Sequence, residues 1–188
     1  MPLSDAPVEP EILAAETVFA GRVWDVRRER FRLEHSEPVR EFVAHPGAVA
    51  ILALDDDDRV LLIRQYRHPI RTAEWELPAG LLDVEGEPPL DAARRELAEE
   101  ADLVAERWER LLAFHTTPGG SDERLEVFLA QGLRPADSTF ERTEEEADLA
   151  WRWVPLGEAV AAVLDGRLEN AILQLGVLAL HARRTPGG

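Results

Sequence analysis

Hydrophobic and polar positions lie along this chain in short runs, most of which have the period of a strand rather than that of a helix. Alternating or continuously apolar segments, bounded by Gly, Pro and Asp turns, predict β-strands. These segments are residues 22–33, 40–47, 48–55, 59–67, 74–80, 108–116, 124–133 and 149–155. Residues 1–15, rich in Pro and acidic side chains, predict a loose arm ahead of them.

One internal segment, residues 88–101, has the period of a helix. Pro88 and Pro89 suit the first turn of a helix, where a missing N–H costs nothing. The apolar stripe that follows consists of Leu90, Ala93, Leu97 and Ala101. Two more helices are predicted over 156–164 and 169–183. Strands on both sides of one internal helix, with helices at the end, predict an α/β sandwich with a mixed sheet rather than a doubly wound parallel sheet.

Charge and composition narrow the possible functions. The formal net charge is −16, from 37 acidic and 21 basic residues, which argues against a nucleic-acid partner because phosphate backbones are bound by clustered Lys and Arg. The absence of cysteine excludes disulfides, thiolate metal sites and cysteine nucleophiles. The N-terminus lacks the pattern of a signal peptide, and the longest apolar stretch is too short to span a bilayer. We therefore expect a cytoplasmic protein with no membrane partner.

Three glutamates of the predicted internal helix, Glu96, Glu99 and Glu100, raise a physical question. Positions three and four apart share a helix face, where each like-charged pair costs about 0.2–0.5 kcal/mol. One interpretation is an ordinary solvated face in an acidic protein. The other is a site for a hard divalent cation such as Mg²⁺, which needs several oxygen ligands. A backbone carbonyl of the Ala79–Gly80 turn could supply a further ligand.

The surrounding residues favour the metal site. Residues 80–103, which we call the signature segment, resemble the signature of the Nudix hydrolases. The matching positions are Gly80, Glu87, Arg95, Glu96, Leu97, Glu99, Glu100 and Leu103. There are two departures: six residues rather than five separate Gly80 from Glu87, and Asp102 replaces a glycine. Because Asp tolerates the left-handed conformation that helix ends often need, neither departure removes a carboxylate ligand.

Further segments resemble the ADP-ribose pyrophosphatase branch of that family. They are residues 64–69, 74–83, 117–123, 144–148 and 166–171. The resemblance covers residues 20–182 and implies a Nudix α/β/α sandwich. It also implies an N-terminal region of dimerisation strands (1–45), which would exchange between the subunits of a homodimer, and a hydrolase domain (46–188).

The resemblance implies an enzyme that hydrolyses ADP-ribose to AMP and ribose 5-phosphate. The cofactor would be Mg²⁺, with Mn²⁺ possible, and a metal-activated water would attack the diphosphate. Three alternatives stay open: a hydrolase of another nucleoside diphosphate sugar such as GDP-mannose, a module that binds ADP-ribose without cleaving it, and an enzyme that removes oxidised nucleotides. Non-catalytic modules usually add a DNA-binding domain and lose signature glutamates, and this chain shows neither feature.

Residue roles follow from the same resemblance. Glu96, Glu99 and Glu100 would bind the metal together with the backbone of Ala79, while Arg95 would orient one of these glutamates. Glu87 would be an outer support of the site or simply an acid at a helix N-terminus, where the dipole favours it.

The general base would come from an acidic loop late in the chain. Glu146 matches best, Glu145 is the neighbouring alternative, and Glu99 is a further catalytic candidate. The competing interpretation of residues 144–146 is a solvated acidic loop.

Six residues are predicted to contact the substrate: Arg67, Trp24, Arg40, Leu81, Ser121 and Glu123. Arg67 would bind the diphosphate, because a guanidinium pairs with phosphate through two hydrogen bonds. Trp24 would stack on the adenine or else pack in a dimer interface, and Arg40 would complete the stack from the partner subunit. Ser121 and Glu123 would reach the terminal ribose or simply form a turn.

The other aromatic residues receive no functional role. Four tryptophans are predicted to lie in the core: Trp75, Trp108, Trp151 and Trp153. The five histidines show no metal-ligand spacing. They are His35, His45, His68, His115 and His181.

Overall fold

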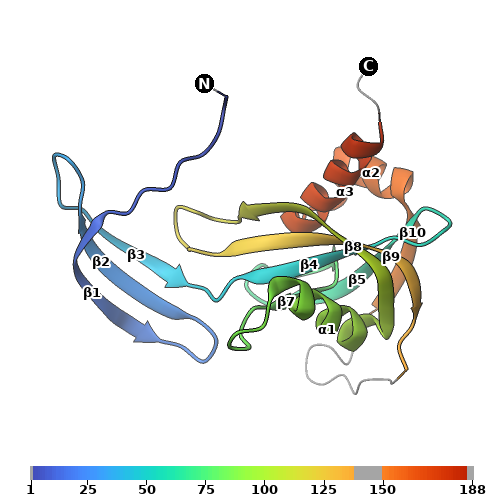
Figure 1. Cartoon of the computed structure of the whole chain (residues 1–188), viewed down its shortest axis with the longest axis horizontal. Coiled ribbons are helices and arrows are strands. Elements are labelled where there is room, and N and C mark those ends of the chain that lie inside the picture. The colour runs from blue at the N-terminus through green and yellow to red at the C-terminus, as the bar shows by residue number, and fades with distance from the viewer. Residues whose placement is uncertain (1, 138–149, 186–188) are drawn as a thin grey trace. The chain divides into compact units, whose positions relative to one another are not determined.

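The structure is a computed structural model that describes residues 2–137 and 150–185. Its elements, shown in Figure 1, are β1 (Glu11–Ala20), β2 (Asp25–Arg32), β3 (Val39–Ala44), β4 (Ala48–Ala53), β5 (Arg59–Arg67), β6 (Thr72–Glu76), β7 (Ala79–Leu81), α1 (Pro89–Ala101), β8 (Leu103–His115), β9 (Arg124–Pro135), β10 (Ala150–Pro155), α2 (Leu156–Leu164) and α3 (Ala171–Arg184). The chain divides into two compact units. The first, which we call the N-terminal unit, runs to His45 and includes Thr117–Glu123; the second, the catalytic unit, is formed by the remaining residues.

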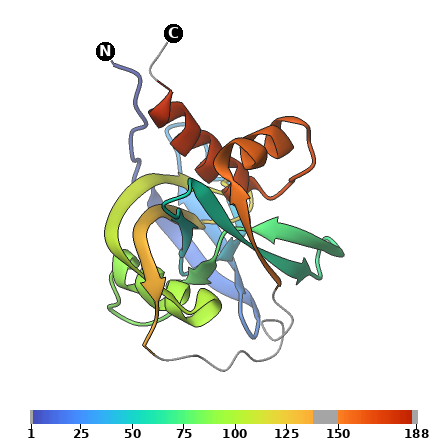
Figure 2. The same ribbon diagram turned by 90° about the vertical axis from the view of Figure 1, so that its right-hand side faces the viewer.

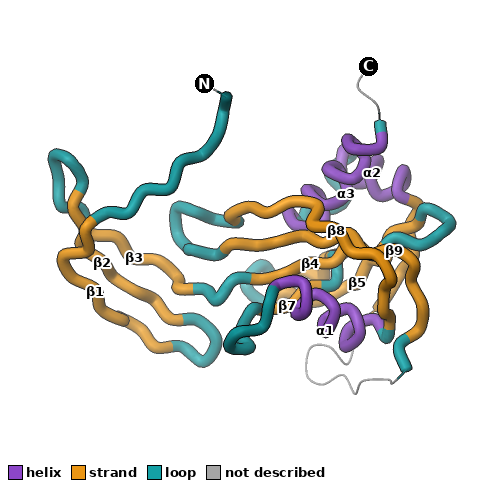
Figure 3. Tube along the Cα trace, in the orientation of Figure 1, coloured by secondary structure: helices purple, strands orange, loops and turns teal. Residues whose placement is uncertain are grey.

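The N-terminal unit is built on one antiparallel sheet of order β1-β2-β3, so it consists of strands and loops alone (Figure 3). Ion pairs connect the strands: Arg28 of β2 lies 3.1 Å from Glu16 of β1 and 2.7 Å from Glu41 of β3. The prediction of a loose arm over residues 1–15 is therefore wrong from Glu11 onward. The acidic side chains that suggested an arm belong to a strand that pairs with an arginine-rich neighbour.

The catalytic unit contains two sheets, of order β7-β4-β9-β8 and β10-β5-β6. The β4–β9 pair is parallel while the other pairs are antiparallel, so the predicted mixed α/β architecture is confirmed. The two faces of β4 show how the layers form: Val49, Ile51 and Ala53 pack in one core cluster with α1. The alternate residues, from Ala50 to Leu54, pack in a second cluster with α2 and α3. The helices accordingly cover opposite faces, as Figure 2 shows.

The helix α1 has the expected apolar side and the expected end. Ala93, Leu97 and Ala101 are buried, together with Ala92. Asp102 adopts the left-handed conformation at the C-terminus, with φ of 53°. Of the four tryptophans predicted to lie in the core, Trp151 of β10 does not, because its side chain is 47% exposed.

None of the helices in the described part of the chain combines the length and the apolar character needed to cross a membrane.

Candidate active site

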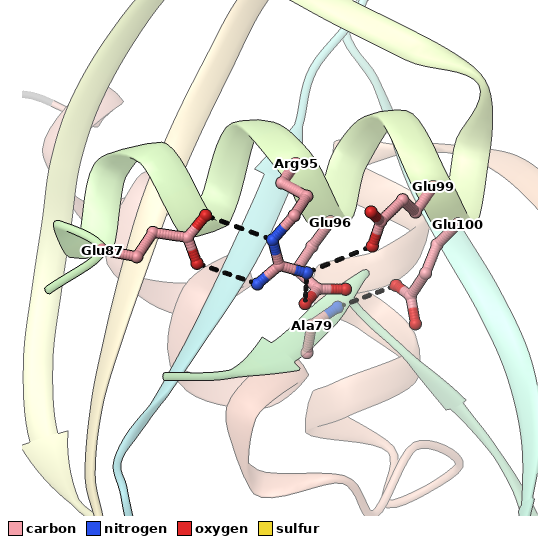
Figure 4. Close-up of polar contacts among 6 residues, drawn as sticks. All are labelled: Ala79, Glu87, Arg95, Glu96, Glu99 and Glu100. Atoms are coloured by element: carbon pink, nitrogen blue, oxygen red, sulfur yellow. Dashed lines mark hydrogen bonds and ion pairs between the residues drawn. The ribbon is translucent and has the colours of Figure 1, made fainter. Parts of the chain in front are cut away.

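Three glutamates of the signature segment, Glu87, Glu96 and Glu99, contact one arginine, as Figure 4 shows. Arg95 donates from Nε and Nη2 to the two carboxylate oxygens of Glu87, at 3.2 and 3.0 Å. Its Nη1 donates to Glu96 at 2.6 Å and to Glu99 at 3.1 Å. A single guanidinium thus lies among three carboxylates and offsets the repulsion between Glu96 and Glu99, which lie three residues apart on α1.

The same contacts shift the pKa values of Glu87 and Arg95. The Arg95 guanidinium, through its hydrogen bonds, holds the pKa of the Glu87 carboxyl below its ordinary value. The hydrogen bond to Glu87 likewise raises the pKa of Arg95, with burial opposing it and Glu96 adding to it. Both groups are therefore charged at neutral pH.

The strand β7 brings its backbone against the side of α1 that carries the glutamates. Antiparallel pairing with β4 sets Ala79 opposite Ala50 and Gly80 opposite Val49. The Ala79 N–H donates to a Glu100 carboxylate oxygen at 2.9 Å, and Glu100 is only 5% exposed.

Gly80 lies where a side chain would collide with Glu96. A Cβ at this position would stand 2.0 Å from Cδ of Glu96 and 2.1 Å from Oε1. The glycine at position 80 therefore lets the backbone of β7 approach the Glu96 carboxylate without displacing it.

The donor atoms fit a hard divalent cation, although Arg95 holds the carboxylates in the present arrangement. Within residues 2–137 and 150–185, no three acidic or histidine side chains are grouped as a metal centre. Carboxylate oxygens on one helix face, beside a strand without a side chain at Gly80, are nevertheless the ligand type that such ions bind. Glu96, Glu99, Glu100 and the Ala79 carbonyl could hold one.

Arg67, the predicted diphosphate ligand, is oriented by a buried carboxylate. Its Nε and Nη2 donate to the two oxygens of Glu76 at 2.8 and 2.7 Å. The Glu76 side chain is 4% exposed, whereas that of Arg67 is 43% exposed. Sequence reasoning missed Glu76, and the only signal was an acidic residue in a strand between Trp75 and the buried Leu77.

The N-terminal unit carries four other predicted substrate ligands: Trp24, Arg40, Ser121 and Glu123. Trp24 lies between β1 and β2, and its ring stacks on that of His45 with centroids 4.2 Å apart. Ser121 donates from Oγ to the Val43 carbonyl at 3.1 Å and accepts from the Glu123 N–H at 3.1 Å. The sequence pattern predicts no functional role for His45.

The remaining predictions concern four residues. Leu81 lies in β7 and packs against the core cluster of α2 and α3. Glu145 and Glu146, the proposed bases, lie outside the described residues. Arg40, on β3, donates to the Val39 carbonyl at 2.8 Å.

The architecture and the signature segment together define a Nudix protein, and comparison with known proteins agrees. The family model of the NUDIX domain matches residues 44–174, so the chain belongs to the Nudix family and the resemblance seen in the sequence is confirmed. An ADP-ribose pyrophosphatase of Mycobacterium tuberculosis (strain ATCC 25618 / H37Rv) is 46% identical over 176 residues, which cover 93% of this chain and 84% of the relative. Membership implies a general dependence on divalent cations.

Two further comparisons extend this result. An ADP-ribose pyrophosphatase of Bacillus subtilis (strain 168) is 39% identical over 140 residues, covering 74% of this chain and 75% of the relative. The crystal structure of an ADP compounds hydrolase superposes with a TM-score of 0.77 at 24% identity and covers 96% of both chains. At that identity the superposition establishes the fold alone.

Proposed function

We propose that this protein hydrolyses ADP-ribose to AMP and ribose 5-phosphate with Mg²⁺ as its cofactor. The observation that carries the proposal is the 46% identity to an ADP-ribose pyrophosphatase over 93% of the chain, the N-terminal unit included. The complete set of signature glutamates on α1 supports hydrolysis over binding without turnover.

We assign separate roles in the reaction to residues of the catalytic unit. Glu96, Glu99 and Glu100 bind the cation with the Ala79 carbonyl. Mg²⁺, when bound, offsets the charge of the diphosphate and lowers the pKa of a water molecule. Arg67, whose guanidinium is held by Glu76, binds the diphosphate and fixes its orientation.

A carboxylate then accepts the proton of the attacking water. We assign this role to Glu146, with Glu145 as the neighbouring alternative and Glu99 as the third. The water oxygen forms a new bond to phosphorus, and the bridging P–O bond breaks, which releases AMP and ribose 5-phosphate. Removal of the base should lower kcat by roughly 10²–10⁴-fold and leave KM nearly unchanged.

The other predicted substrate contacts are proposed to act in a homodimer. Trp24 stacks on the adenine and Arg40 of the partner subunit completes the stack. Ser121 and Glu123 bind the terminal ribose, and Leu81 contacts the substrate from β7.

The test is a substrate panel with product identification. The purified protein is incubated with Mg²⁺ and ADP-ribose, GDP-mannose, UDP-glucose or dinucleoside polyphosphates, and the released nucleotide is identified. We expect AMP from ADP-ribose at the highest kcat/KM. Glu100→Gln should lose most of this activity, and Glu106→Gln, an exposed glutamate of β8, should retain it. Preferred release of GMP from GDP-mannose, or binding of ADP-ribose without any product, would contradict the proposal.

A further inference from the structure

The geometry points to His45 as a positioning residue for the nucleobase site, a role that rests on the proposed function. We infer that its ring supports one face of Trp24, while its backbone N–H, bonded to Asp122, attaches it to the loop of residues 117–123. His45 would then act on substrate binding without touching the reacting atoms.

The first observation is the stack between the two rings. Their centroids are 4.2 Å apart and their planes meet at 19°, an offset-parallel arrangement that aromatic rings favour. The His45 side chain is 8% exposed, whereas Trp24 is 37% exposed. The supporting ring is therefore fixed by its surroundings, while part of the tryptophan remains accessible to a ligand.

The second observation is the attachment of His45 to the loop that carries the proposed ribose ligands. His45 Nε2 lies 3.3 Å from a carboxylate oxygen of Glu123, and the His45 N–H donates to Oδ1 of Asp122 at 2.8 Å. A parallel bridge between Val43 and Ser121 joins the same loop to the end of β3. One residue thus contacts both the aromatic side chain and the polar loop.

The third observation is the tight backbone that presents Trp24. A Cβ on Gly21 would stand 2.1 Å from the Trp24 carbonyl oxygen, so the turn closes only around a glycine. The Gly21 N–H also donates to Oδ1 of Asp25 at 3.2 Å. The backbone position of Trp24 is set by this turn, and the stack on His45 then sets the direction of its ring.

A preorganised aromatic surface binds a base more tightly because the ring need not be immobilised on binding. Stacking on a π-face is the main contribution of such a surface to base affinity. Loss of the His45 ring should therefore weaken every ligand that contains the purine and spare ligands that lack it. Since the role inferred for His45 is limited to orienting Trp24, kcat should not change.

The test compares two substitutions that remove different contacts. His45→Gln keeps a hydrogen-bond donor for Glu123 but removes the ring, whereas His45→Phe keeps the ring and removes the donor. His35→Gln is the matched control, because the His35 side chain in the same unit is 94% exposed. Binding of AMP and of ribose 5-phosphate is measured by calorimetry, KM and kcat for ADP-ribose are measured where turnover occurs, and thermal unfolding confirms that each variant is folded.

We expect His45→Gln to weaken AMP binding and to raise KM for ADP-ribose by roughly fivefold or more, with ribose 5-phosphate binding and kcat unchanged. His45→Phe and His35→Gln should bind AMP as the wild type does. In a Trp24→Leu background the effect of His45→Gln should disappear, because the two residues act through one contact.

Two results would overturn the inference: equal loss of AMP binding in His45→Phe and His45→Gln, or full additivity with Trp24→Leu. Failure of the proposed function is separately visible, since it would appear as absence of turnover in the wild type while the AMP titrations still report on His45.

Discussion

At the scale of single residues, the active site depends on one missing side chain. Gly80→Ala places a methyl group 2.0 Å from Cδ of Glu96. This overlap forces the Glu96 carboxylate to move, and it can do so because it is the flexible end of its side chain. We expect a loss of roughly 10²-fold in kcat/KM, the effect of about 1 Å of misplacement, with little change in stability. Initial rates at saturating Mg²⁺ and denaturant unfolding measure the two quantities.

The control for this variant is Gly157→Ala in α2, where an added Cβ meets nothing within 4 Å. It should leave activity unchanged and stabilise the helix slightly, since alanine is the better helix former. Equal activity of Gly80→Ala and wild type would show that the close approach of β7 to Glu96 is not needed for activity.

The pair of Arg67 and Glu76 allows a second residue-scale prediction. Arg67→Ala leaves the buried Glu76 carboxylate without its two hydrogen bonds, so unfolding should become easier by about 1–3 kcal/mol. Adding Glu76→Leu should recover most of that loss, because replacement of both partners by apolar groups is nearly neutral. Both variants should keep a raised KM. Urea unfolding that shows the double variant to be less stable than the single would contradict this account.

The candidate site could be predicted from the sequence where spacing carries the information. Glu96, Glu99 and Glu100 share a helix face by their positions alone. Glu76 and His45 could not be found in this way, because each acts through a contact across strands or loops that no local period records. The arrangement of the glutamates around Arg95 also required the structure.

At the scale of elements, the end of α1 tests the departure of Asp102 from the family signature. Its φ of 53° lies in the left-handed region, which β-branched residues avoid. Asp102→Val should therefore destabilise the protein by about 1–2 kcal/mol, whereas Asp102→Gly should not. Thermal unfolding distinguishes the two, and equal stability of the valine and glycine variants would show that the backbone conformation is not what selects the residue.

At the element scale, β4 and β1 show what a local hydrophobic pattern reveals and what it leaves out. β4 has six buried residues in a row and was found from its apolar run. β1 has no buried residue and was missed. Its strand conformation depends on pairing with β2 and on charge pairs such as Glu16 with Arg28, which a single-segment pattern does not contain.

At the scale of the whole molecule, net negative charge is spread along the whole chain. The chain carries −16 in total, and residues 1–45 hold nine acidic and six basic side chains, a net charge of −3. Most of the negative charge therefore lies in the remaining residues.

The proposed homodimer follows from the lack of a core in the N-terminal unit. No residue from 2 to 45 is fully buried, although this segment exposes apolar side chains, Phe19 of β1 at 62% and Val23 of the β1–β2 connection at 64% among them. A three-stranded sheet needs a covered hydrophobic face for stability, and a second copy of the chain would provide one. Sedimentation at micromolar concentration should give a dimer of twice 21.0 kDa.

Salt and a surface substitution make this prediction specific. Raising the ionic strength from about 0.01 M to about 0.15 M shortens the Debye length from about 30 Å to about 8 Å. Repulsion between the acidic subunits should fall, and the dimer should therefore become tighter.

Phe19→Asp should shift the equilibrium to monomer and lower activity, because Trp24 and Arg40 are proposed to act across the interface. Leu164→Asp, at a 72% exposed position of α2, is the matched control and should do neither. A fully active wild-type monomer would contradict both the dimer and the shared nucleobase site.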